Sequence, residues 1–267
     1  MCRSERQIIK SKLYVFDMDG VLFRMDDPLP HASETVRRLQ LRGDKVWFLT
    51  NNSSKSRAEY VAKLAKFNII TDEEHIMTSA YGTSVWLAEH GRIGQSVFVV
   101  GEAGLENELT AAGMKIVPAG AEKCDIVVAG WDRQFSYSKL AAAHRLITEG
   151  ALFIATNRDV TYPDAGGKTL PGGGSIVAAI ETCSETAPIT IGKPEVYTLN
   201  LILKMAQKTP EDTVVIGDRI DTDIAIGRRV SANTVLVLTG ISTRRDAETS
   251  AADIKPEIII DDLSYLT

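Results

Sequence analysis

The chain has 267 residues, 44% of them hydrophobic and 24% charged, which is typical of a soluble globular protein. Its formal net charge is −5 and no basic stripe stands out, which argues against nucleic-acid binding. No apolar stretch approaches the roughly 20 residues of a membrane helix, and the polar N-terminus lacks a signal-peptide core. Three widely separated cysteines exclude a disulfide framework, so the sequence predicts a reduced, cytoplasmic protein.

Short apolar strands alternate with amphipathic helical stretches from the N-terminus onward, which predicts an α/β protein with a mostly parallel sheet. A strand at 13–16 is followed by a helix at 33–41, for which Ser33 is the expected N-cap. A second strand at 46–49 precedes a helix at 57–67, whose apolar residues share one face.

The middle of the chain continues the alternation. Strands are predicted at 96–100, 125–128 and 152–155, with helices near 105–112 and 139–149. Periodicity leaves open whether these strands extend the first sheet or form a second unit inserted into it. The later strands are grouped with the first two as core strands and are predicted at 189–191, 214–216, 235–238 and 258–260.

Four of the predicted core strands end in polar clusters at their carboxyl ends. The clusters are DMDG (17–20), TNNS (50–53), GKP (192–194) and GDRIDTD (217–223). Ligands of open α/β sheets bind outside the carboxyl ends of the strands, so these clusters should converge on one crevice. Carboxylates without histidine or thiolate suit Mg²⁺, while a hydroxyl, backbone N–H groups and a lysine suit phosphate. The combination predicts a phosphoryl-transfer site.

Each cluster taken alone has a simpler interpretation. Asp17 and Asp19 could end a strand in a turn, Thr50 could cap a helix, and Lys193 could be a solvated loop residue. The acids of 217–223 could form a surface loop, although they lack the glycine and glutamate of an EF-hand. Their joint occurrence after four strands favours a common site.

The four segments DMDGV (17–21), FLTNNS (48–53), GKP (192–194) and GDRIDTD (217–223) resemble the four motifs of the haloacid dehalogenase superfamily of phosphatases. The resemblance covers essentially the whole chain. It implies a Rossmann-like parallel-sheet core with an inserted α/β cap domain. Asp19, two residues after the first aspartate, matches the phosphatases of the superfamily rather than its dehalogenases.

The resemblance implies a role for each motif. Asp17 is expected to be the nucleophile that forms an aspartyl-phosphate, and Asp19 the general acid and base. Thr50 and the N–H groups of Asn51 and Asn52 are expected to hold phosphate oxygens.

The same resemblance implies that Lys193 offsets the phosphate charge and orients the nucleophile. The cofactor is expected to be Mg²⁺, bound by Asp17, by the backbone carbonyl of Asp19 and by Asp218. Asp223 is expected to support the metal through water or from the surrounding shell. Asp221 is the weaker candidate for that role.

Extra chain lies between the second and third motifs, where this superfamily inserts a C2-type α/β cap. The resemblance implies a core at 1–80 and 187–267 and a cap at 81–186. FLTNNSSKSR, FIATNRDVTYP, LPGGGSIVAAIE and VLVLTGIST look most like the NagD-like, para-nitrophenylphosphatase branch. The cap residues expected to reach the substrate lie at 157–163, where Tyr162 occupies the position at which some relatives place a substrate-contacting side chain. The alternative is that the segment 157–163 only shapes a turn.

The expected function is Mg²⁺-dependent hydrolysis of a small phosphorylated metabolite. Candidates are phosphoglycolate, glycerol phosphate, sugar phosphates, pyridoxal phosphate and nucleoside monophosphates, with para-nitrophenyl phosphate as a generic substrate. A phosphoaspartate regulatory domain is the alternative from another class, but it lacks a second acid such as Asp19. A sugar-phosphate phosphotransferase normally carries its cap after the first motif. A homodimer through the caps is left open.

Overall fold

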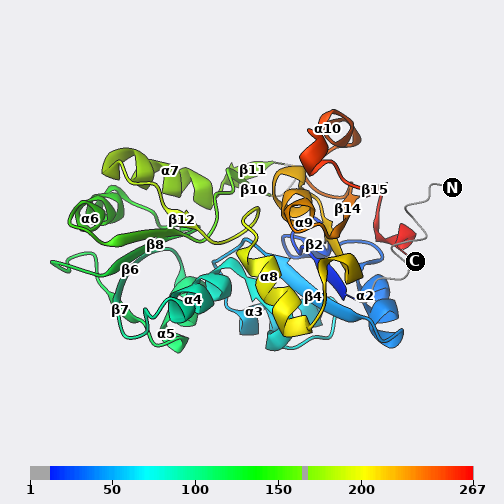
Figure 1. The fold of residues 1–267 in the computed structure, drawn as a ribbon, viewed down its shortest axis with the longest axis horizontal. Helices are drawn as coiled ribbons and strands as arrows, with labels where there is room; N and C mark the ends of the chain where they lie inside the picture. Colours follow the sequence, from blue (N-terminus) through cyan, green and yellow to red (C-terminus); the bar gives the residue numbers. More distant parts are fainter. Residues whose placement is uncertain (1–12, 164–167, 267) are drawn as a thin grey trace.

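Two parallel sheets lie side by side in the computed structural model, which describes residues 13–163 and 168–266 (Figure 1). The larger sheet has six strands in the order β15-β14-β13-β1-β4-β5, and all of its neighbouring pairs are parallel. Its strands are β1 (Leu13–Phe16), β4 (Lys45–Thr50), β5 (Ile76–Thr78), β13 (Thr213–Gly217), β14 (Asn233–Val237) and β15 (Ile258–Ile260).

The middle of the chain forms the second sheet, with the strand order β12-β9-β8-β6-β7 and again only parallel pairs. Its strands are β6 (Ser96–Val100), β7 (Lys115–Val117), β8 (Ile126–Ala129), β9 (Leu152–Ala155) and β12 (Ile189–Thr190). This arrangement answers the question that periodicity left open, because the middle strands form a sheet of their own. The fold is a Rossmann-like core with an inserted α/β cap.

One strand is in a different sheet from the one predicted. The sequence groups residues 189–191 with the core strands, whereas β12 pairs with β9 of the cap sheet. Only two residues of β12 pair in this way, and a short apolar run carries no information about its partner. Lys193 therefore reaches the core from the edge of the cap sheet.

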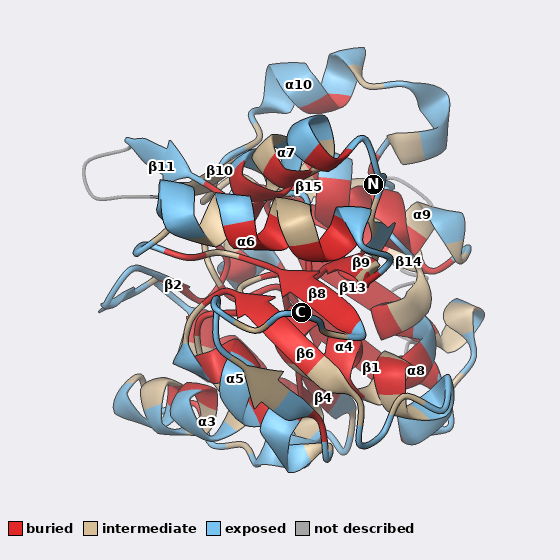
Figure 2. Ribbon diagram, turned by 90° about the vertical axis from the view of Figure 1, so that its left-hand side faces the viewer, coloured by how far each residue is buried: buried red, intermediate tan, exposed pale blue. Residues whose placement is uncertain are grey.

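Helices cover both faces of each sheet. On the core sheet, α2 (Ala32–Leu41) and α3 (Arg57–Lys66) pack on one face, and α8 (Tyr197–Ala206) and α9 (Ala225–Arg229) on the other. The cap sheet lies between α6 (Tyr137–Thr148) with α7 (Gly173–Ser184) and α4 (Ser79–Glu89) with α5 (Ala103–Ala111). Figure 2 shows the buried strands in red, with the outer helix faces exposed. The apolar cores thus hold the carboxyl ends of both sheets in place.

The start of α2 differs from the prediction. Ser33 is not the N-cap, because the helix begins at Ala32 after His31, which has a left-handed backbone and makes no side-chain cap. Ser33 therefore falls inside the first turn. By contrast, Ser56 caps α3 through a capping box with Glu59.

The remaining elements are short. Two hairpins pair β2 (Phe23–Arg24) with β3 (Asp27–Pro28) and β10 (Thr161–Pro163) with β11 (Thr169–Pro171). The short helix α10 (Arg244–Thr249) follows β14. Among the described residues, no helix is both long enough and apolar enough to cross a membrane.

Candidate active site

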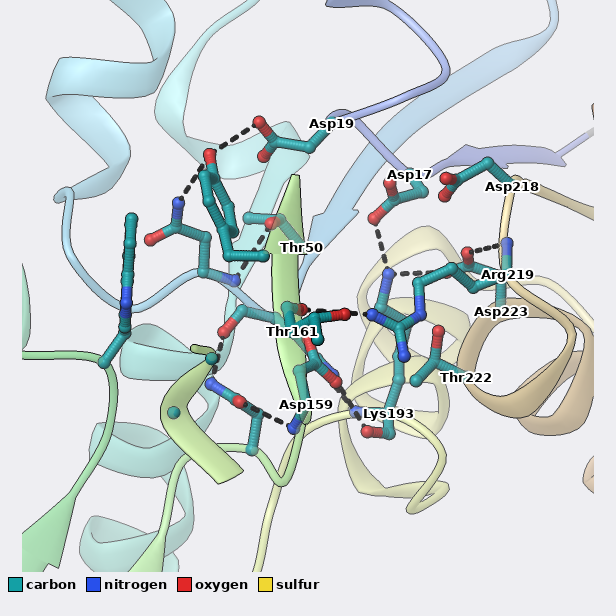
Figure 3. Close-up of a pocket in the computed structure, with 17 residues that line it drawn as sticks. Asp17, Asp19, Thr50, Asp159, Thr161, Lys193, Asp218, Arg219, Thr222 and Asp223 are labelled. Atoms are coloured by element: carbon teal, nitrogen blue, oxygen red, sulfur yellow. Dashed lines mark hydrogen bonds and ion pairs between the residues drawn. The ribbon is translucent and has the colours of Figure 1, made fainter. Parts of the chain in front are cut away.

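The site lies at the carboxyl edge of the core sheet, where the cap meets it (Figure 3). Phe16 of β1 pairs with Phe48 of β4 on one side and with Ile216 of β13 on the other. Since these strands are parallel, the residues that follow them emerge at the same edge. All the predicted site residues line this one pocket, namely Asp17, Asp19, Thr50, Asn51, Asn52, Tyr162, Lys193, Asp218 and Asp223.

Lys193 is the centre of a buried ionic cluster. Its Nζ lies 2.5 Å from Oδ1 of Asp17 and 2.6 Å from Oδ1 of Asp223, and its side chain is only 3% exposed. Burial alone would lower the pKa of Lys193, but the charges of the two aspartates outweigh burial and raise it. The ammonium group is therefore charged and fixed beside the expected nucleophile.

The carboxylates of the cluster carry more charge than the lysine offsets. Burial raises the pKa of Asp17 well above its usual range, and burial together with the charge of Asp223 raises the pKa of Asp218 to about 7. One oxygen of Asp218 accepts a hydrogen bond from the N–H of Ile241 at 2.7 Å. Three buried aspartates that face one ammonium group call for another cation.

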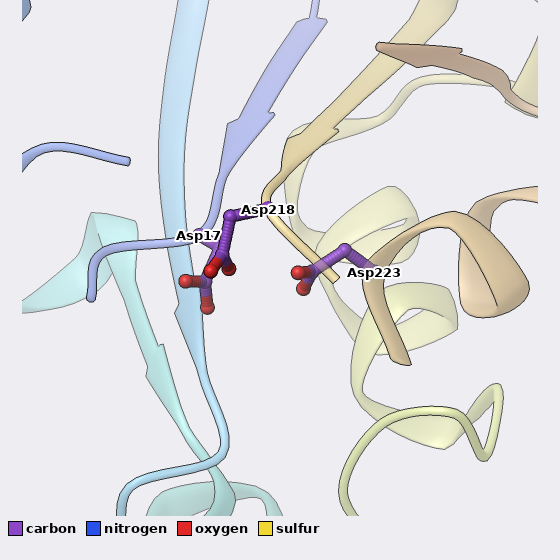
Figure 4. Close-up of side chains that lie close together, drawn as sticks. All are labelled: Asp17, Asp218 and Asp223. Carbon is purple, nitrogen blue, oxygen red and sulfur yellow. The ribbon is translucent and has the colours of Figure 1, made fainter. Parts of the chain in front are cut away.

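A divalent metal fits this arrangement. Asp17, Asp218 and Asp223 each offer a carboxylate oxygen, and these three atoms lie within 4.8 Å of one another (Figure 4). An all-oxygen set of this kind matches the preference of Mg²⁺. Of the two acids left open by the sequence, Asp223 lies in the cluster. Asp221 instead pairs with Arg219 at 2.9 Å, and its side chain is 65% exposed.

Asp19 lies beside the cluster rather than in it. Its Oδ1 accepts a hydrogen bond from the Tyr162 hydroxyl at 2.8 Å, and burial raises its pKa. The same hydroxyl accepts a hydrogen bond from Nδ2 of Asn52 at 3.3 Å, and the Tyr162 ring stacks on Trp131 with centroids 4.3 Å apart. Tyr162 thus reaches the pocket from the cap, where its hydroxyl contacts Asp19 and Asn52.

The loop after β4 arranges the expected phosphate contacts. Thr50 is buried, and its hydroxyl oxygen accepts a hydrogen bond from the N–H of Asn52 at 3.0 Å. Gly20, after the paired aspartates, has φ +85°, and a Cβ there would lie 2.6 Å from an oxygen of Asp218. A glycine is therefore needed where the first and fourth motifs meet.

The sequence interpretation missed several residues that line the pocket. Trp131, which follows β8, is one of them, whereas Asp159, which follows β9, lies in the predicted 157–163 segment. The rule that located the core motifs would have found Trp131 had it been applied to the middle strands. Arg219 lies within the fourth motif and donates from Nη1 to the carbonyl oxygen of Thr161 at 3.2 Å. Its reach toward the cap had no sequence signal.

The fold and the site define a class, that of α/β proteins with an aspartate-rich, metal-binding type of site between a Rossmann-like core and a cap. Residues 14–115 match the family model described as haloacid dehalogenase-like hydrolase, and residues 190–266 match one described as HAD-hydrolase-like. The chain belongs to the haloacid dehalogenase-like hydrolases, and within them to the NagD-like phosphatases.

Individual relatives agree with this membership. An acid sugar phosphatase of Staphylococcus saprophyticus is 35% identical over 89% of this chain and 90% of its own length. The p-nitrophenyl phosphatase from Archaeoglobus fulgidus superposes with a TM-score of 0.88 at 32% identity, covering 96% of this chain and 98% of that one. A glycerol phosphate phosphatase from Mycobacterium tuberculosis in complex with magnesium has a TM-score of 0.89 at 31% identity, covering 97% and 77%. The chain is a phosphoric monoester hydrolase.

Proposed function

We propose that this phosphatase hydrolyses a small phosphorylated metabolite with Mg²⁺ and through a phosphorylated Asp17. The observation that carries the proposal is the cluster in which Asp17 contacts Lys193 at 2.5 Å and lies beside Asp218 and Asp223. A buried carboxylate among other acids is costly unless it serves chemistry or binds a cation. Here it stands at the carboxyl edge of the sheet, in reach of a ligand.

In the first half-reaction, a carboxylate oxygen of Asp17 forms a bond to phosphorus while the ester oxygen leaves. Lys193 offsets negative charge on the phosphoryl group and keeps Asp17 oriented. The Thr50 hydroxyl and the N–H groups of the following loop hold the phosphoryl oxygens. Asp17, Asp218, Asp223 and the backbone carbonyl of Asp19 are the proposed ligands of Mg²⁺, which when bound offsets the repulsion between carboxylate and phosphate.

Asp19 acts as general acid in the first half-reaction and as general base in the second. It gives a proton to the leaving oxygen and then takes one from the water that attacks the phosphoaspartate. Burial raises the pKa of Asp19, which favours the protonated form that the first step needs. The hydrogen bond from Tyr162 at 2.8 Å holds the carboxyl group in place.

The organic part of the substrate lies on the cap side of the pocket. That side is formed by the stacked pair Trp131 and Tyr162, by Thr161 and by two glycines, Gly172 and Gly173. The names of the relatives support a sugar phosphate or glycerol phosphate among the candidates. We propose that the cap comprises residues 81–186 and that β12, which follows, adds a strand to its sheet. The composition supports a cytoplasmic protein with no nucleic-acid or membrane partner.

The test is hydrolysis of para-nitrophenyl phosphate, followed by kcat/KM over a panel of phosphorylated metabolites. We expect turnover with Mg²⁺ and none after EDTA treatment. Asp17→Asn should abolish turnover and leave the circular dichroism spectrum unchanged, whereas Asp221→Asn, on the exposed neighbour of the cluster, serves as the matched control. Wild-type turnover by Asp17→Asn would refute the proposed nucleophile.

A further inference from the structure

The carboxyl edge of the cap sheet is occupied by a segment of the core. We call residues 51–57, which follow β4, the core loop. Three glycines face this loop: Gly130 and Gly192, which follow cap strands, and Gly104, in the first turn of α5. A Cβ on any of them would lie 2.4 to 2.5 Å from the nearest loop atom. The crevice of a parallel sheet normally receives a ligand. In the cap, that crevice receives the loop of the second motif.

Asn51 is the residue of the core loop that joins the most partners. Its Nδ2 donates to the carbonyl oxygen of Lys193 at 2.9 Å and to Oδ1 of Asp159 at 2.9 Å. Its Oδ1 accepts a hydrogen bond from the N–H of Lys193 at 2.8 Å. Both donor positions of the carboxamide are therefore used, and its oxygen is engaged as well. The side chain serves the protein, which leaves only the backbone N–H of Asn51 for phosphate.

Asp159 brings the cap into this network. Burial raises the pKa of Asp159, and the charge of Arg219 opposes that rise. Arg219 also donates to the carbonyl oxygen of Thr161, and Tyr162 donates to Asp19. Residues 159–162 of the cap are thus held from the second motif, the fourth motif and the first. Asn51 is the member of this set that also holds Lys193.

We propose that Asn51 is a positioning residue. Through its carboxamide, it couples the position of cap residues 159–162 to the position of the Lys193 ammonium group beside Asp17. The amide group is planar and rigid, so a shift of Asp159 that turns it also moves the two bonds to the Lys193 backbone. This proposal rests on the role given above to Lys193. It explains how contacts made by the cap can shift the Lys193 ammonium group relative to the nucleophile Asp17.

The pair can be tested by exchanging its members. Asn51→Asp keeps the size of the side chain and the acceptor for the Lys193 N–H, but it turns an acceptor toward the Lys193 carbonyl and toward Asp159. Asp159→Asn alone removes the charge that faces Arg219 and leaves the Lys193 bonds intact. Combined with Asn51→Asp, it restores a donor between positions 51 and 159 and leaves the Lys193 carbonyl unpaired.

These differences predict a split in the kinetics. Asn51→Asp should lower kcat roughly 10- to 100-fold, as expected for the loss of buried hydrogen bonds to a catalytic segment. Asp159→Asn should mainly raise KM. The double variant should keep the low kcat of Asn51→Asp and the raised KM of Asp159→Asn, because position 159 still carries no charge to face Arg219. Asn233→Asp is the matched control, because Nδ2 of Asn233 also donates to two carbonyls, those of Thr213 and Glu211, away from the site.

Amide hydrogen exchange provides a readout that does not depend on activity. Asn51→Asp should speed exchange in both 156–162 and 190–193, and Asp159→Asn only in 156–162. The double variant should match Asp159→Asn in 156–162 and Asn51→Asp in 190–193. If Asn51→Asp changes one segment alone, or matches the control in exchange and kinetics, the coupling is refuted. If Asn51→Asp does not fold, Asn51→Ser, which also removes the carboxamide, is compared with the wild type and with Asn233→Asp in exchange and kinetics. An inactive wild type would end the proposed function, while exchange would still decide this inference.

Discussion

Replacing Lys193 by methionine keeps the length of the side chain and removes its charge from the centre of the cluster. The ammonium contacts Asp17 at 2.5 Å and Asp223 at 2.6 Å, and the side chain is 3% exposed, so solvent screens these pairs little. Removing one partner of a buried ion pair costs about 3–5 kcal/mol. At about 2–4 °C per kcal/mol, the thermal midpoint should fall by roughly 10 °C.

The loss of stability in Lys193→Met should depend on pH, and the pKa shifts of the neighbouring carboxyl groups set the direction. Burial raises the pKa of Asp17 and of Asp218, so the folded protein holds protons that the unfolded chain has already released. Such groups stabilise the fold below their unfolded pKa, and this contribution is lost as pH rises through the folded pKa. Without Lys193 more negative charge is left unpaired. The midpoint difference should be small near about pH 5 and full near about pH 8.

The assay is thermal unfolding in EDTA over this pH range, with kcat for para-nitrophenyl phosphate measured in Mg²⁺. Lys204→Met is the control, because Lys204 is 77% exposed and its pair with Glu89 spans 3.5 Å. An exposed pair contributes about 0–1 kcal/mol. For Lys193→Met, kcat should fall about 10²- to 10³-fold. A midpoint equal to that of the wild type at high pH, or a kcat within a few-fold of it, would refute this account of the cluster.

Three further outcomes follow from the site. Burial and neighbouring charge raise the pKa of Asp218 to about 7, so Mg²⁺ must displace protons below that pH. The stabilisation by Mg²⁺ should therefore grow between about pH 5 and about pH 8, and equal midpoint shifts would contradict this. Calorimetric Mg²⁺ affinity should fall at least about tenfold in Asp223→Asn and stay unchanged in Asp221→Asn, and the reverse order would exclude the assigned ligand set. Tyr162→Phe removes the 2.8 Å bond to Asp19 but keeps the ring, so kcat/KM should drop about tenfold with the order of substrates retained; only Tyr162→Ala should reorder the panel.

The sequence predicted the core of the fold well, because its strands are apolar runs bounded by turns and polar clusters. Strands 13–16 and 258–260 match β1 and β15 in both bounds. The convergence of Asp17, Thr50 and Asp218 followed from one rule, that parallel strands end at a common edge.

Features that depend on how the cap packs on the core could not be predicted from the sequence. The pairing of β12 with the cap sheet rests on two residues, and nothing in residues 189–191 specifies a partner. Arg219, in the fourth motif, donates to the carbonyl oxygen of Thr161 in the cap, and no sequence pattern predicts that contact. The choice between Asp221 and Asp223 likewise depended on the turn that directs each side chain.

The central claim is that Asp17 carries the phosphoryl group during turnover. Rapid acid quench of the enzyme with substrate, followed by trypsin and mass spectrometry, tests this directly on the peptide that spans residues 13–24. The account predicts a peptide heavier by one phosphoryl group, with fragment ions that assign the group to Asp17 rather than to Asp19. A burst of product with no phosphorylated Asp17, or with the group on another residue, would contradict it.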